Sequence, residues 1–203
     1  IPLTGATLLL ISVAVGAAAT YRQKRIAERR FSDVRKVANY LLFDLYDNAA
    51  QLPGSTPMRA DIIKNSLTYL DALAKDAASD TELRKEIIEG YLRLGDVQGN
   101  LNAASLGDTA GAIASYKKGL ELSADGATPV IERLHASLLL QLGSAEVITG
   151  RAEGIEHLRQ SVAIYERLSA AAPKDARAHI NLAQALHGLG GQMSQAGGFV
   201  AAN

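Results

Sequence analysis

Three Leu-Gly pairs recur along this chain of 203 residues at nearly equal intervals. The pairs stand 48 and then 47 residues apart: Leu94-Gly95, Leu142-Gly143 and Leu189-Gly190. A unit that reappears at a fixed period cannot bury its apolar face alone, so successive units stack and build an extended surface. The spacing predicts a helical repeat protein, and it favours binding over catalysis in an enclosed pocket.

Each pair belongs to a packing stripe on the first helix of a two-helix unit. A large residue, a leucine and a glycine stand at positions i, i+3 and i+4, which share one helix face. The stripes are Tyr91, Leu94 and Gly95; Leu139, Leu142 and Gly143; Leu186, Leu189 and Gly190. On the second helix, small, large and small residues follow at spacings of four and three: Ala112, Tyr116 and Gly119, then Gly154, Leu158 and Ser161. The third unit reaches Gly197 and has no room for a second helix.

These stripes resemble the tetratricopeptide repeat (TPR), which places a large residue, Leu and Gly on one helix and small residues around an aromatic on the next. The usual TPR period is about 34 residues. An insertion at 99–107 and lengthened second helices account for the surplus. A period near 47 also suits HEAT or armadillo repeats, but small residues at both packing positions favour TPR. The expected repeat region is 79–203, divided into 79–127, 128–173 and an incomplete 174–203.

Composition narrows the fold class and the chemistry. Ala and Leu are abundant, so we expect an all-α fold. The net charge of zero argues against a nucleic-acid partner. The chain has no cysteine, and its histidines form no zinc motif. We therefore expect no catalytic residue, no metal and no cofactor in this segment.

The N-terminal residues 1–20 carry no charge, and such a helix spans roughly 30 Å, the thickness of a bilayer core. We expect a transmembrane helix there, the alternatives being an uncleaved signal peptide or a buried apolar helix. The pattern over residues 21–50 predicts an amphipathic juxtamembrane helix. Residues 56–78 are expected to form a helix that caps the repeats, with Thr56 and Pro57 at its start. Ser79 and Glu82 suggest a capping box for the following helix.

The order of these parts resembles the C-terminal half of bacterial membrane-anchored serine/threonine protein kinases with TPR repeats. The resemblance rests on residues 27–39 (AERRFSDVRKVAN), 52–57 (LPGSTP), 91–99 (YLRLGDVQG) and 107–110 (GDTA). It implies a kinase domain ahead of the membrane helix, although the segment itself has no kinase motif and is not expected to be an enzyme. The implied fold is a TPR-like helical-hairpin solenoid preceded by a transmembrane helix and a long juxtamembrane helix.

The family resemblance and the basic residues after the apolar span predict opposite membrane orientations. Five basic residues follow the apolar span on the repeat side, and positive-inside bias taken alone puts that side in the cytoplasm. They are Arg22, Lys24, Arg25, Arg29 and Arg30. The resemblance implies the reverse, because a kinase needs cytosolic ATP. We expect a single-pass membrane protein with its repeats outside the cytoplasm.

A protein or peptide ligand is expected in a groove formed by the first helix of each unit. Counting from the glycines gives the candidate lining residues Glu89, Asp96, Asn100, Ser137, Ser144, Gln184 and His187. This set is polar and mildly acidic, and it lacks the basic residues of TPR clamps that hold C-terminal carboxylates. The insertion at 99–108 is a second candidate binding element. The alternative function is structural, with the amphipathic helix and the solenoid joining two copies in a homodimer without a ligand.

Overall fold

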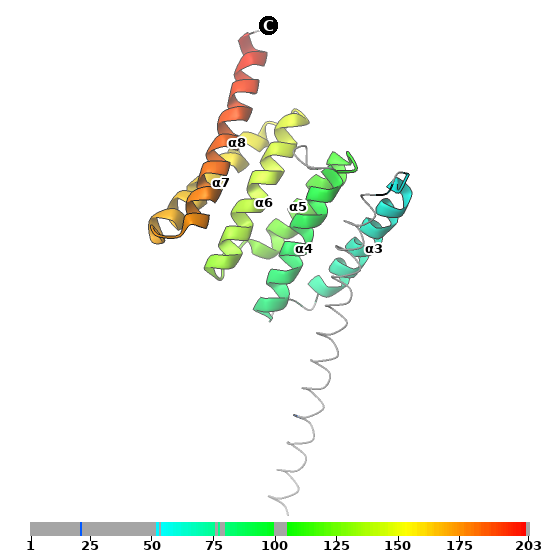
Figure 1. Ribbon diagram of the computed structural model, residues 1–203. Helices are drawn as coiled ribbons and strands as arrows, with labels where there is room; N and C mark the ends of the chain where they lie inside the picture. Colours follow the sequence, from blue (N-terminus) through cyan, green and yellow to red (C-terminus); the bar gives the residue numbers. More distant parts are fainter. Residues whose placement is uncertain are drawn as a thin grey trace, which may run out of the picture. The chain divides into compact units, whose positions relative to one another are not determined.

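The computed structural model describes residues 54–75, 77, 80–99 and 105–201, together with Tyr21 and Leu52. These residues form helices and connecting turns, with no strand among them, which confirms the all-α expectation for this part. The helices are α3 (Thr56–Ala74), α4 (Thr81–Gly99), α5 (Thr109–Ser123), α6 (Pro129–Ile148), α7 (Glu153–Ala171) and α8 (Ala176–Ala201) (Figure 1). The chain divides into two compact units, Ile1–Arg59 and Ala60–Asn203, and the second contains the helices from α4 onward and most of α3.

The predicted membrane helix at 1–20 lies outside the described residues, as does nearly all of the predicted amphipathic helix at 21–50. Among the helices that the structure describes, none is both long and apolar enough to cross a bilayer.

The helices from α4 onward are stacked in chain order. Each packs against the next, and α6 also lies beside both α4 and α8 (Figure 1). The stack therefore has two layers. Helices α4, α6 and α8 form one layer. In the other, α5 packs against α4 and α6, and α7 packs against α6 and α8. At the α6–α7 turn, Gly150 has a φ of 75°, a left-handed conformation that glycine adopts without steric cost.

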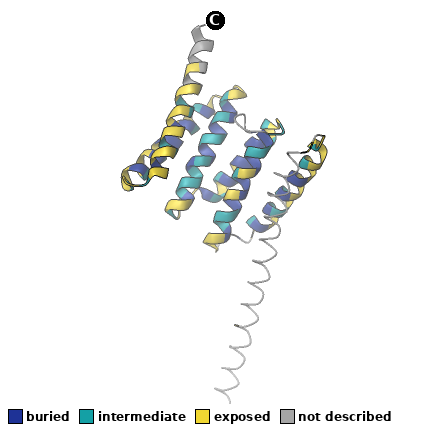
Figure 2. Cartoon of the chain, in the orientation of Figure 1, coloured by how far each residue is buried: buried dark blue, intermediate teal, exposed yellow. Residues whose placement is uncertain are grey.

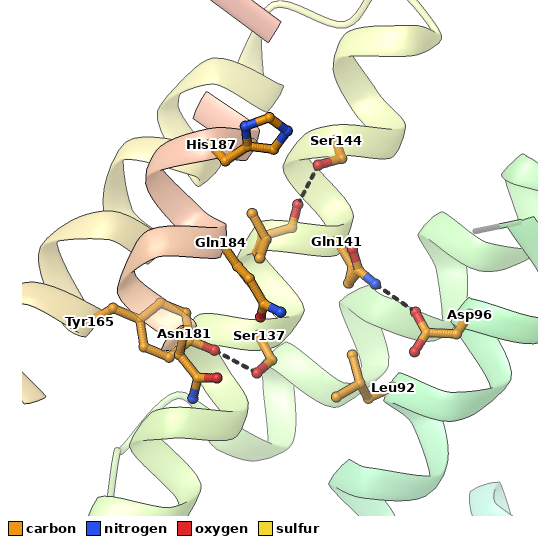
Figure 3. A pocket seen from close by; sticks show the side chains of 11 residues that line it. Leu92, Asp96, Ser137, Gln141, Ser144, Tyr165, Asn181, Gln184 and His187 are labelled. Atoms are coloured by element: carbon orange, nitrogen blue, oxygen red, sulfur yellow. Dashed lines mark hydrogen bonds between the residues drawn. The ribbon is translucent and has the colours of Figure 1, made fainter. Parts of the chain in front are cut away.

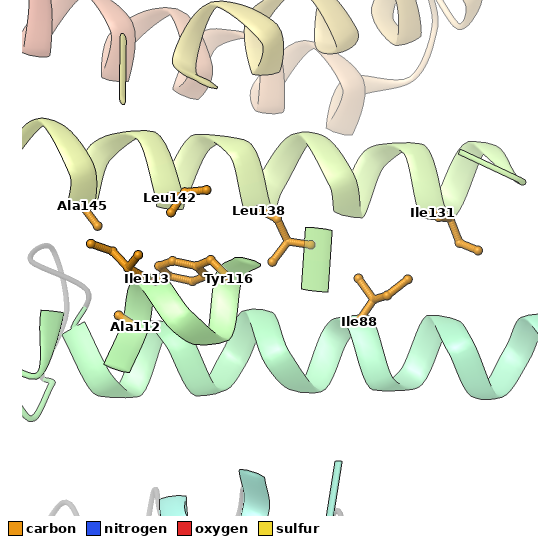
Figure 4. Close-up of a cluster of buried hydrophobic side chains, with 8 residues drawn as sticks. All are labelled: Ile88, Ala112, Ile113, Tyr116, Ile131, Leu138, Leu142 and Ala145. Atoms are coloured by element: carbon orange, nitrogen blue, oxygen red, sulfur yellow. The ribbon is translucent and has the colours of Figure 1, made fainter. Parts of the chain in front are cut away.

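Side chains between the layers form the core (Figure 2). One cluster joins α4, α5 and α6: Ile88, Ala112, Ile113, Tyr116, Ile131, Leu138, Leu142 and Ala145 (Figure 4). A second joins α6, α7 and α8: Ala136, Val162, Tyr165 and Ala185. Burying one large apolar side chain contributes about 1.5–3 kcal/mol to the free energy of folding. Burial of these clusters is therefore the main contribution to the stability of the stack.

Two of the repeated glycines permit close helix contacts. A Cβ atom at Gly95 would overlap the ring of Tyr116 on α5. A Cβ atom at Gly143 would lie 2.7 Å from the carbonyl oxygen of Gly154, which belongs to the α7 backbone. Glycine at these positions is therefore required by packing, as the repeat pattern predicted.

The carboxylate of Asp71 ties α3 to the stack. It accepts a hydrogen bond of 2.6 Å from the Tyr91 hydroxyl on α4, and the Lys118 ammonium on α5 lies 2.6 Å away. Burial tends to raise the pKa of Asp71, but the hydrogen bonds from Lys118 and Tyr91 outweigh it and the net pKa is lowered. The part of α3 that belongs to this unit, 60–74, is thus joined to α4 and α5.

One sequence prediction about a helix end needs correction. Asp80 caps α4, because its Oδ1 accepts hydrogen bonds from the backbone N–H groups of Glu82 and Leu83. Ser79, proposed for that role, lies outside the described residues. Helix α8 runs through Gly188, Gly190 and Gly191 to Ala201 without a break.

Candidate functional site

A groove of about 440 Å³ runs across the layer formed by α4, α6 and α8 (Figure 3). Three helices that are distant in sequence supply its walls, and α7 contributes one aromatic side chain. Its lining residues are Leu92, Asp96, Ser137, Leu140, Gln141, Ser144, Tyr165, Asn181, Gln184, His187 and Gly188. The groove exists because equivalent faces of successive first helices are placed side by side by the stacking.

Five of the seven residues nominated from the sequence lie together in this groove: Asp96, Ser137, Ser144, Gln184 and His187. Glu89 is an exposed residue of α4 that does not line it. It precedes Asp96 by two helical turns, so it shares that face but lies about 10 Å further along the axis. Asn100 lies outside the described residues. That any of these residues binds a partner stays a prediction.

Asp96 connects three helices. Its Oδ1 accepts a hydrogen bond of 2.9 Å from the Tyr116 hydroxyl on α5 and another of 2.8 Å from the Gln141 amide on α6. Burial raises the pKa of Tyr116, and the nearby Asp96 carboxylate raises it further. The phenol therefore remains protonated and continues to donate across the physiological pH range, which holds Asp96 at the groove wall.

Ser137 and Tyr165 form a second fixed point. Their hydroxyl oxygens are 2.7 Å apart, and Ser137 Oγ also donates to the carbonyl oxygen of Arg133. Burial raises the pKa of Tyr165, so this hydroxyl too stays protonated. The two side chains satisfy one another, so Ser137 shapes the α6–α7 side of the groove.

The α8 side of the groove is more exposed. Gln184 and His187 are exposed, and Asn181 is half-buried beside them. Across the groove, Ser144 Oγ donates to the Leu140 carbonyl of its own helix at 2.8 Å, which leaves its lone pairs available as acceptors. This side therefore offers amide, hydroxyl and imidazole groups to a ligand.

Most of the polar side chains that line the groove are neutral hydrogen-bonding groups. Asp96 is the one carboxylate among the lining residues, and the groove contains neither lysine nor arginine. Within the described residues, no group of three His, Cys, Asp or Glu side chains could hold a metal ion. Asn and Gln amides both donate and accept, so they match the alternating donors and acceptors of a peptide backbone.

Six lining residues were not predicted from the sequence: Leu92, Leu140, Gln141, Tyr165, Asn181 and Gly188. Gln141 is one turn after Ser137, and Asn181 is three residues before Gln184, so helical spacing could have found both. Leu92 could have been found in the same way from Asp96. Tyr165 had no local signal, because it reaches the groove from α7 through a contact with Ser137 that links residues 28 apart.

The described part of the predicted binding loop, 99 and 105–108, is tied to neighbouring helices. The N–H of Leu106 donates to the Val97 carbonyl, and the N–H of Asp108 donates to the Gln98 carbonyl. Asp108 then caps α5 through a hydrogen bond of 2.9 Å from the N–H of Gly111. These residues thus serve the α4–α5 connection.

Comparison of the chain with protein-family models, curated proteins and solved structures finds no match. Its function is therefore inferred from the groove and the repeat pattern.

Proposed function

We propose that residues 81–201 form a TPR-like module that binds a protein or peptide in the groove across α4, α6 and α8. Two features support the TPR assignment. Both complete units are pairs of packed helices, α4 with α5 and α6 with α7. In both, a glycine at the same position permits close approach of the second helix.

The observation that carries the binding proposal is the convergence of polar side chains from all three first helices on one groove. Here Asp96, Gln141 and Ser144 project from helices whose positions are fixed by the core below. A preorganised wall of this kind lowers the ordering cost of holding an extended peptide.

We further propose, from the family resemblance, that this module is the non-catalytic part of a membrane-anchored bacterial serine/threonine kinase. In this proposal residues 1–20 cross the membrane and the groove senses or recruits a partner outside the cytoplasm. The absence of kinase motifs from the sequence agrees with phosphoryl transfer by residues outside the segment. The coding sequence upstream of Ile1 tests this part, since absence of a kinase domain there would overturn it.

The groove itself can be tested with a phage-displayed library of random dodecapeptides, panned on the whole chain in a mild detergent. Enriched peptides should bind with micromolar affinity. Because Gln184 is exposed, Gln184→Ala should leave the fold intact and remove one or two hydrogen bonds to the peptide. The dissociation constant of the peptide for the Gln184→Ala variant, measured by fluorescence anisotropy, should rise about tenfold.

Gln160→Ala is the matched control, because Gln160 is also exposed on a helix but lies on α7 away from the groove. It should leave peptide affinity unchanged. Failure of the library to enrich any peptide, or equal effects of the two variants, would remove the support for a peptide-binding groove.

A further inference from the structure

The charge of the groove across α4, α6 and α8 is negative and is concentrated at one point. The described lining residues include one carboxylate, that of Asp96, and neither lysine nor arginine. The α8 wall offers amide and imidazole groups, and no Asp, Glu, Lys or Arg occurs in residues 178–203. A ligand in the groove therefore meets a full negative charge at Asp96 and mostly neutral polar groups elsewhere.

The Asp96 carboxylate is oriented by two neighbouring helices. Its Oδ1 accepts hydrogen bonds from the Tyr116 hydroxyl on α5 and from the Gln141 amide on α6. Both donors are neutral, so they orient the carboxylate without cancelling its charge. Tyr116 belongs to the buried core, which limits how far this wall of the groove can move. A charge held in position in this way loses little side-chain freedom when a ligand binds.

Apolar side chains lie beside this charge. Leu92 stands one helical turn before Asp96 on α4, and both are half-buried lining residues of the groove (Figure 3). Leu140 of α6 contributes a further apolar group to the lining. Lysine and arginine bury their aliphatic stems against apolar surface while the charged end reaches a polar partner. An apolar surface next to a carboxylate matches this combination.

Other ligand chemistries gain less at this point of the groove. An acidic side chain, a C-terminal carboxylate or a phosphate would face Asp96 without a basic lining residue to pair with, and like charges repel. A neutral apolar side chain would remove solvent from the carboxylate without replacing its hydrogen bonds. A metal ion would need more ligands, and within the described residues no group of three His, Cys, Asp or Glu side chains could hold one.

We propose that the groove selects peptides that carry a lysine or an arginine, whose cationic group pairs with Asp96 and whose aliphatic stem lies against Leu92. This inference rests on the proposed peptide binding and adds the sequence preference of the ligand. The amides of Asn181 and Gln184 can bond to the backbone of any peptide, so they do not select a sequence. The one charged contact supplies the selection and fixes the register of the peptide.

Parallel panning of a phage-displayed dodecapeptide library tests the preference, with the whole chain and its Asp96→Asn variant as targets. Asparagine keeps the shape of the side chain and a carbonyl oxygen that accepts from Tyr116 and Gln141, but it has no charge. Peptides enriched on the native chain should share a lysine or arginine at one aligned position, and those enriched on Asp96→Asn should not. Glu89→Gln is the matched control, because it removes an exposed carboxylate of the same helix outside the groove and should retain the preference.

Affinity measurements on one enriched peptide separate the charge from the apolar stem. Replacing its shared basic residue by methionine keeps an unbranched stem and removes the charge. The dissociation constant, measured by fluorescence anisotropy, should rise about tenfold for the native chain and less than about twofold for Asp96→Asn. The measurement on the native chain needs no protein variant, so an unchanged affinity there is decisive whatever the stability of Asp96→Asn.

The outcomes separate this inference from the proposed peptide binding. Enriched peptides without a shared basic residue, an unaffected affinity of the methionine peptide, or equal losses for the native chain and Asp96→Asn overturn the basic preference and leave peptide binding standing. Equal loss of the preference in Glu89→Gln and Asp96→Asn also overturns it, because a general acidic field would then replace a specific pair. Enrichment of no peptide overturns both proposals.

Discussion

The α4–α5 and α6–α7 pairs use the same repeated glycine for two different contacts. Gly95 makes room for the edge of an aromatic ring, that of Tyr116, whose hydroxyl reaches Asp96 on the same helix as the glycine. Gly143 makes room for backbone, since the carbonyl of Gly154 and the N–H of Leu158 lie within 3.0 Å of its Cβ position. A shared sequence position therefore does not imply a shared contact.

This difference determines how each helix pair can respond to a methyl group added at the glycine. A side chain can rotate away from an intruding methyl group, at the cost of its own hydrogen bond. A helix backbone can move only if the whole helix shifts, and α7 is held on its other side by α8. The two pairs should therefore respond differently to the same substitution.

Gly143→Ala should have the largest effect. The added methyl group forces α6 and α7 apart, and the strain exceeds the gain in helix propensity, so the free energy of unfolding should fall by about 3 kcal/mol. Urea unfolding followed by circular dichroism measures this. Replacing Leu158 by Ala in the same chain should not restore stability, because the obstructing atoms include backbone. Restoration would show that the Leu158 side chain is the real obstacle.

Gly95→Ala should cost less, about 2 kcal/mol, because the ring of Tyr116 can swing away and lose its hydrogen bond to Asp96. Here a second substitution should compensate. Tyr116→Leu makes the first pair resemble the second, and a double-mutant cycle by urea unfolding should give a favourable coupling of about 1–2 kcal/mol. Strict additivity of the two substitutions would contradict the ring contact.

Gly190→Ala should have the smallest effect and the opposite sign. With nothing near its Cβ position, alanine should gain about 0.5–1 kcal/mol of stability through helix propensity. Thermal unfolding gives the value. A loss of stability would mean that another part of the same chain covers Gly190.

Much of the helical layout follows from local sequence. The Leu-Gly spacing and the small-large-small pattern of the second helices predicted α4 to α7, and Pro57 marked the start of α3. The extent of α8 was not predicted, since this helix runs through Gly188, Gly190 and Gly191 on to Ala201. Glycine disfavours a helix only weakly, so a run of glycines does not by itself end one.

Groove residues that lie at repeated positions of the first helices could be predicted from the sequence. Contacts between side chains of different helices could not. Asp96, Ser144 and His187 were found by counting along one helix face from each glycine. The bonds of Asp96 to Tyr116 and Gln141 join different helices, and Tyr165 enters from α7. Such contacts depend on how the helices stack, which a single sequence does not encode in any short pattern.

One oxygen of Asp96 accepts hydrogen bonds from both Tyr116 and Gln141. It therefore links a residue of the groove wall, Gln141, to a residue of the buried core, Tyr116. If the groove binds a peptide as proposed, a ligand that draws the Gln141 amide towards itself would leave Tyr116 as the remaining one of these two donors to Asp96. A ligand that competes for the carboxylate would weaken the hydrogen bond between Asp96 and Tyr116, beside Gly95. The contact between α4 and α5 would then depend on what the groove holds.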